Sequence, residues 1–177
     1  MGQLANRMLR AVKLDPHLYE EVEADATAMT QAMLVVVLSS AAAGIGSMGM
    51  VQHPNLILSA LGALIGWYIW AFMTYWIVTK LLPEKDTKAE YSQLLRTIGF
   101  SSAPGILRVL GVVPFLTNLV FMVAGIWMLA AMVIAVRQAL DYQSTARAVG
   151  VCAIGWIIQL LFAWILLALM TGSMGQV

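Results

Sequence analysis

Charged side chains are scarce in this sequence. Of its 177 residues, 11% are Asp, Glu, Lys or Arg and 61% are hydrophobic, whereas a soluble domain has about 25% charged residues. This scarcity excludes an ordinary soluble protein and indicates an integral membrane protein. A net charge of +1 gives no general attraction to nucleic acid, so we expect no nucleic-acid partner. The single cysteine, Cys152, excludes a disulfide within the chain.

Motifs that supply enzyme chemistry are also missing. The sequence has no Gly-rich phosphate loop, no serine nucleophile elbow and no pair of histidines at a zinc-binding spacing. We therefore expect a non-enzymatic protein with no catalytic residues, no metal site and no cofactor.

Long apolar segments dominate what is present. A helix needs about 20 apolar residues to cross the ~30 Å hydrocarbon layer of a membrane. The segments that meet this length are 29–50, 56–79, 91–112, 115–136 and 148–170. We therefore predict an all-α integral membrane protein, a five-helix transmembrane bundle over 29–170. Short amphipathic helices form a cytoplasmic N-terminal arm at 1–28, and 171–177 is a short tail.

The third segment differs from the other four. It carries two arginines near its ends and a proline in its middle, so we predict a crossing helix with a kink, anchored by snorkelling arginines. A re-entrant or interfacial helix is the alternative. The residues assigned to this helix break, and to any transport pathway through it, are Arg96, Gly99, Phe100, Ser101, Ser102, Pro104, Gly105 and Arg108.

The basic residues predict the orientation. With five crossings, all ten lysines and arginines except Arg108 fall on the side of the N-terminus. Because basic loops stay in the cytoplasm, the N-terminus is predicted to be cytoplasmic and the C-terminus outside, in a cytoplasmic (inner) membrane.

The N-terminal arm has a basic part and an acidic part. Arg7, Arg10 and Lys13 share one side of a helix, and we expect them in the headgroup layer, in contact with membrane lipids. Asp15 and Pro16 then begin a second helix. The residues expected to face a protein partner are Asp15, Leu18, Tyr19, Glu20, Glu21 and Glu23. A solvated acidic cap over the bundle is the plainer interpretation.

Small residues at a four-residue spacing occur in the first two spans. Ser40 with Gly44, and Gly62 with Gly66, predict close helix packing. Packing within the chain is the first interpretation, and contact with a second copy, giving a homo-oligomer, is the other.

Several stretches together resemble the Yip (Ypt-interacting protein) domain family, and its bacterial branch most. They are "LDPHLYEEVEAD", "LGALIGWYIWAFMTYWI", "RTIGFSSAPGILRVLG" and "IWMLAAMVIAVRQALDYQSTARAVGVCAIGW". By this resemblance, Asp15, Leu18 and Tyr19 match the family's cytoplasmic Asp-Leu-Tyr element. Gly99, Phe100 and Pro104 match its positions in the third span. The resemblance implies a five-helix membrane domain with a cytoplasmic N-terminus.

These observations leave more than one function open. The first hypothesis is a membrane scaffold or interaction protein, such as an accessory subunit, with a protein partner in the membrane or cytoplasm. The alternative is a carrier or channel for a small solute, lipid or ion that uses the broken third span. A membrane-organising role of the basic arm is the third.

Overall fold

The computed structural model describes residues 2–48, 55–81, 90–113 and 115–174. Over these ranges the chain is helical and forms no strand, which confirms the all-α prediction. The α-helices are α1 (Gln3–Val12), α2 (Pro16–Ala24), α3 (Ala28–Gly46), α4 (Leu56–Trp76), α5 (Tyr91–Ser101), α6 (Thr117–Ala139) and α7 (Thr145–Met174). A π-helix, η1 (Ile77–Leu81), follows α4, and a 3-10 helix, η2 (Ala103–Val112), follows α5. Residues 49–50 of the first predicted span, the charged loop at 82–89 and the last three residues of the tail lie outside the described residues.

The two helices of the N-terminal arm are defined by local chemistry. Pro16 is the first residue of α2, and the Asp15 carboxylate accepts a hydrogen bond from the backbone N–H of His17 at 3.0 Å. Leu14, between the two helices, has a φ of 59°, and this left-handed residue turns the chain from α1 into α2.

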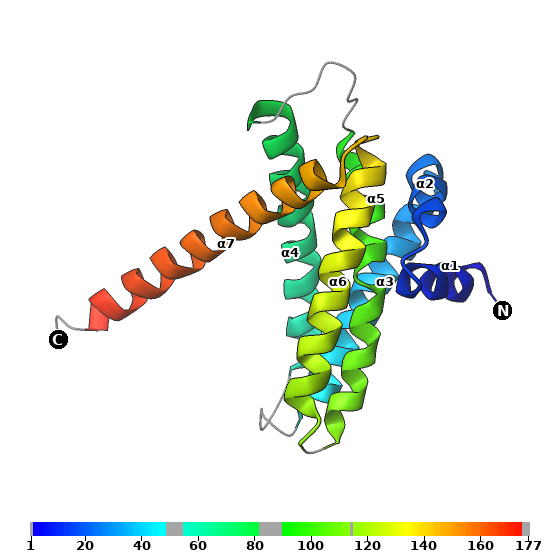
Figure 1. Cartoon of the computed structure of the whole chain (residues 1–177). Helices are drawn as coiled ribbons and strands as arrows, with labels where there is room; N and C mark the ends of the chain where they lie inside the picture. Colours follow the sequence, from blue (N-terminus) through cyan, green and yellow to red (C-terminus); the bar gives the residue numbers. More distant parts are fainter. Residues whose placement is uncertain (1, 49–54, 82–89, 114, 175–177) are drawn as a thin grey trace.

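A bundle of α3, α4, α5 with η2, and α6 forms the body of the protein (Figure 1). The arm, α1 and α2, lies against one side of the bundle, and α7 projects away from the other side. Helix α5 is central, because it contacts α2, α3, α4 and α6 and every residue from 94 to 101 is buried. The broken third segment therefore lies in the interior of the bundle.

Large apolar side chains face outward on α4 and α6. Ile65 on α4 is 60% exposed and Ile126 on α6 is 61% exposed, and both have exposed apolar neighbours along the same helices. Soluble monomers rarely expose apolar surfaces of this extent. These faces fit contact with lipid.

Three of the described helices are long and apolar enough to cross a membrane: Ala28–Gly46, Leu56–Leu81 and Thr117–Ala139. The sequence predicts five such helices, and this count is wrong for the described residues. The third predicted span divides into α5 and η2, of 11 and 10 residues, and neither is long enough alone. A shorter apolar helix, Thr145–Leu161, corresponds to the fifth.

The predicted kink is a change of helix type. Pro104 has no N–H to bond to the carbonyl of Phe100, and after Ser101 the backbone passes from α to 3-10 winding. Runs of 3-10 helix longer than about four residues are uncommon, so this segment is held by its neighbours. At Gly105 an added Cβ would lie 2.0 Å from Ser39 Oγ, which shows how closely η2 lies against α3.

Candidate functional site

The basic residues of the arm bind its acidic residues. Arg7 Nε donates to Glu21 Oε1 at 2.8 Å, Arg7 Nη2 to Asp25 Oδ2 at 2.7 Å, and Arg7 Nη1 to Gln31 Oε1 at 3.0 Å. Arg7 is only 3% exposed; its ion pairs join α1 to α2 and to Asp25 at the end of α2, and its hydrogen bond to Gln31 joins α1 to α3.

Arg10 completes this network. Its Nε donates to Asp15 Oδ2 at 2.7 Å, and its Nη1 pairs with Glu21. The hydrogen bonds from Arg10 lower the pKa values of Asp15 and Glu21, in each case as the largest cause. Arg7 and Arg10 are thus engaged within the arm and do not form the predicted headgroup-facing surface; Lys13 is the exposed member of the three.

The residues predicted to face a protein partner are divided between the interior and the surface. Leu18 and Tyr19 are fully buried against the bundle, so this conformation presents neither to a partner. Glu23 is half-buried. Glu20 is exposed, and its Oε1 accepts a hydrogen bond from Gln138 Nε2 on α6 at 2.8 Å. With Asp15 and Glu21 in ion pairs with arginines, Glu20 is the exposed predicted docking residue that pairs with no described lysine or arginine; its Oε2 lies 3.4 Å from His17 Nδ1.

Arg96 on α5 closes the end of α2. Its Nε donates to the Val22 carbonyl at 2.9 Å, and its Nη2 donates to the Glu23 carbonyl. These carbonyls belong to the last turn of α2, which lacks intrahelical donors and carries the negative end of the helix dipole. The predicted snorkelling of Arg96 to lipid headgroups is replaced by this contact, which fixes the arm to the bundle.

A second contact fixes the arm at the side of the bundle. Trp127 Nε1 on α6 donates to the Val12 carbonyl at the end of α1 at 2.8 Å. Inside the bundle, Trp67 Nε1 donates to the Leu95 carbonyl at 3.0 Å, which ties α4 to α5.

The small residues predicted for packing behave differently from one another. An added Cβ at Gly44 would lie 2.4 Å from Leu56, so Gly44 permits a close α3–α4 contact. At Gly62 and Gly66 an added Cβ meets nothing within 4 Å, so these two glycines form no close packing within the chain. Ser40 and Gly66 instead line a cavity.

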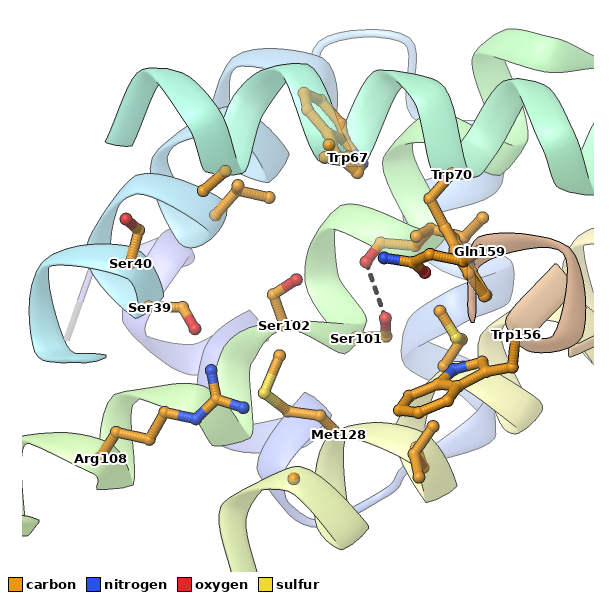
Figure 2. A pocket seen from close by; sticks show the side chains of 17 residues that line it. Ser39, Ser40, Trp67, Trp70, Ser101, Ser102, Arg108, Met128, Trp156 and Gln159 are labelled. Carbon is orange, nitrogen blue, oxygen red and sulfur yellow. Dashed lines mark hydrogen bonds between the residues drawn. The ribbon is translucent and has the colours of Figure 1, made fainter. Parts of the chain in front are cut away.

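This cavity, of about 400 Å³, lies beside the broken segment, among α3, α4, α6 and the middle of α7 (Figure 2). Its polar lining includes Ser101, Ser102 and Arg108, which the sequence assigned to the helix break. Ser101 Oγ donates to the Ile98 carbonyl at 2.7 Å and so serves the backbone next to the break. The side chains that line the cavity are Val36, Ser39, Ser40, Ala63, Trp67, Trp70, Ile98, Ser101, Ser102, Arg108, Met128, Leu129, Met132, Trp156 and Gln159, together with the glycines Gly66 and Gly125.

Arg108 does not extend to the nearer membrane surface as the sequence predicts. Figure 2 shows its guanidinium directed into the cavity, on the side of Ser39 and Ser102. The guanidinium carbon also lies 5.5 Å from the centre of the Phe121 ring. Its Nε is buried and has no hydrogen-bond partner, and the same is true of Trp70 Nε1.

Sequence reasoning missed Trp70, Trp156 and Gln159 as part of this site. Trp156 is 45% exposed and lines the cavity, so the cavity reaches the surface beside α7. Gln159 is a polar residue in an otherwise apolar, uncharged segment, and that isolation is the one signal that pointed to it.

The fold and the cavity together define a class: an all-helical membrane protein whose broken central helix borders a partly polar cavity. The family model of the Yip1 domain matches residues 16–167. The chain therefore belongs to the Yip1 domain family, which confirms the resemblance found in its sequence. No curated protein and no solved structure matches the chain.

Proposed function

We propose that this Yip1 domain protein is a non-enzymatic membrane protein that binds a lipid or another small amphiphile inside its bundle. The observation that supports the proposal is the cavity beside η2, where hydrogen-bond donors without protein partners are surrounded by tryptophan and methionine side chains. A ligand with a polar head and an apolar body matches both parts of this lining. A carrier that uses the broken segment is the transport form of the same proposal.

The proposal includes five membrane crossings in a bacterial inner membrane, with the N-terminus in the cytoplasm. Helix α5 has 11 residues at about 1.5 Å each, and η2 has 10 residues at about 2.0 Å each. Together they extend about 36 Å, which is more than the ~30 Å thickness of the hydrocarbon layer. Irregular backbone is tolerated at membrane depth where protein surrounds it, as it surrounds α5. Helix α7 has 30 residues, which is also sufficient length.

Filling the cavity tests the proposal. Gly66 lines the cavity and has open space around an added Cβ, so the side chain of Gly66→Leu starts in open space and adds volume. Gly62, one turn earlier on α4, has the same open space and does not line the cavity, so Gly62→Leu is the matched control. We expect native mass spectrometry in mild detergent to show bound lipid in the wild type and in Gly62→Leu, and much less in Gly66→Leu. Equal amounts in all three proteins would contradict the proposal.

Reconstitution separates binding from transport. Flux of a labelled lipid, ion or small solute above that of empty vesicles, reduced by Gly66→Leu, supports a carrier. Lipid binding without such flux supports a binding protein that does not transport.

A membrane scaffold that presents α2 to a protein partner is the second candidate. The observation that favours it is the fixed position of the arm, held by the ion pairs of Arg7 and the cap from Arg96, with Glu20 exposed on its surface. A crosslinking pull-down with Glu20→Lys tests this role. Unchanged recovery of the partner would remove the docking claim.

A further inference from the structure

The polar part of the cavity consists mainly of donors. Arg108 supplies a guanidinium, and Ser39, Ser40 and Ser102 supply hydroxyl groups that make no side-chain hydrogen bond to another described residue. Gln159 adds an amide. None of the residues that line the cavity is an aspartate or a glutamate.

Arg108 lacks the partner that a cation in this setting requires. Within the described part of the chain, no carboxylate lies within ion-pair distance of it, whereas Arg7 and Arg10 are both paired. A charge removed from water is stabilised only by an opposite charge or by several hydrogen bonds. The face of the Phe121 ring supplies only a weak attraction. The site therefore lacks a negative group.

We propose that the cavity binds an anionic phosphate group, with Arg108 as the pairing cation and Ser39 and Ser102, which lie beside its guanidinium in Figure 2, as further donors. This inference rests on the proposed function and names the chemistry of its ligand. Guanidinium and phosphate form short, charge-assisted hydrogen bonds, and hydroxyl donors complete the contacts to the remaining oxygens.

The phosphate group has two sources: the headgroup of an acidic lipid or a free phosphate compound. A cavity of about 400 Å³ is large enough for a headgroup and too small for a whole lipid with two acyl chains. The acyl chains of a lipid would lie outside, along the exposed apolar surface of α4 beside Ile65 and Ile69.

The experiment offers phosphatidylglycerol and phosphatidylcholine in equal amounts to the full chain in mild detergent. Native mass spectrometry then counts each bound lipid. We expect the wild type to prefer the acidic lipid. In Arg108→Gln we expect the ratio of bound acidic lipid to bound phosphatidylcholine to fall about tenfold, which is the effect of one charged hydrogen bond. Lys80→Gln removes an exposed cation at the end of η1, outside the cavity, and is expected to leave the preference unchanged.

A second variant keeps the test independent of any folding defect in Arg108→Gln. Ser102→Ala removes one hydroxyl donor beside Arg108, and we expect a smaller loss of preference for the acidic lipid. Competition with inorganic phosphate and glycerol phosphate then identifies the source. Displacement of the lipid at millimolar concentration assigns the site to a free phosphate compound, and resistance assigns it to a lipid headgroup; both outcomes support a phosphate site.

Two results would overturn the inference. One is equal binding of the two lipids by the wild type without competition by phosphate; the other is a preference that both Arg108→Gln and Ser102→Ala retain. Either result leaves the proposed function standing if Gly66→Leu still reduces total bound lipid. If Gly66→Leu and the wild type bind the same total lipid, the proposed function fails as well.

Discussion

At the scale of single residues, the direction of a helix decides what an arginine reaches. The Cα–Cβ bonds of a helix tilt toward its N-terminus. Arg96 lies in the first third of the segment formed by α5 and η2, so its side chain extends outward to the last turn of α2. Arg108 lies in the last third of this segment, so the same tilt turns its side chain back toward the middle of the bundle.

Arg96 is expected to be the more important of the two for stability. Arg96→Met keeps most of the side-chain volume but leaves the Val22 and Glu23 carbonyls without their donors. We expect a loss of about 1.5–3 kcal/mol, the range for hydrogen bonds to charged groups. Thermal unfolding in detergent measures this loss, with exposed Lys13→Gln as the control. Equal melting temperatures for Arg96→Met and the wild type would contradict the role of the cap.

Glu23 is expected to make stability depend on pH near neutrality. Its pKa is raised from the ordinary 4.5 to about 7; burial is the largest cause, Asp141, Glu20 and Glu90 contribute to the rise, and Arg96 opposes it. The folded protein therefore binds more protons than the unfolded chain between these values, so the free energy of unfolding falls as pH rises through this window. Glu23→Gln removes the ionisation, and we expect its stability advantage over the wild type to grow from about pH 5 to about pH 8.

Melting temperatures across this window measure the effect, with exposed Glu20→Gln as the control. Asp25 does not titrate in this pH window, because hydrogen bonds from Thr27 and, as the next largest cause, from Arg7 lower its pKa to about 2. A constant difference between Glu23→Gln and the wild type at all pH values would contradict this prediction.

At the scale of elements, two tight contacts hold the unusual 3-10 helix against α3. One is at Gly105 beside Ser39, and the other is at Gly46, where an added Cβ would lie 1.8 Å from the carbonyl oxygen of Arg108. The first obstacle is a small side chain, but the second is backbone, which cannot rotate away. The contact at Gly46 therefore sets the distance between α3 and η2.

Gly46→Ala is expected to separate α3 from η2. Overpacking of a well-packed interior costs about 1–3 kcal/mol, so we expect a loss of stability of that size. Gly62→Ala is the matched control, because its Cβ meets open space and a helix interior favours alanine over glycine by about 0.5–1 kcal/mol. Thermal unfolding of both variants measures the contrast. A Gly46→Ala protein as stable as Gly62→Ala would show that the two helices are not in this contact.

The sequence predicts some of these features and not others. The break in the third segment could be predicted from Pro104, because the missing backbone N–H is a property of that residue alone and does not depend on the rest of the fold. The length of η2 depends on the surface of α3, and the donors Trp70 and Gln159 come from α4 and α7, so only the folded bundle brings them to Ser102 and Arg108. Likewise, the charge pattern of the arm predicted its two helices, but not that Arg7 pairs with Glu21 in preference to lipid.

At the scale of the whole molecule, the number of crossings decides where the chain ends lie. Three helices are long and apolar enough to cross as single elements, and α5 with η2, and α7, supply the proposed fourth and fifth crossings. We expect reporter groups fused to the N-terminus and to the C-terminus to label from opposite sides of the membrane in intact cells. Labelling of both ends from the same side would contradict an odd number of crossings.

The central position of α5 has a consequence for biogenesis. This segment contains two arginines, and an arginine at the middle of an isolated helix costs about 2.5–3.5 kcal/mol on insertion. In the proposed five-crossing topology, its cations become compatible with the bilayer only after α2 has supplied carbonyls to Arg96 and the other helices have enclosed Arg108. In that topology we expect a nascent chain that ends at residue 112 to hold this segment poorly in the bilayer, and a chain that includes α6 to hold it stably.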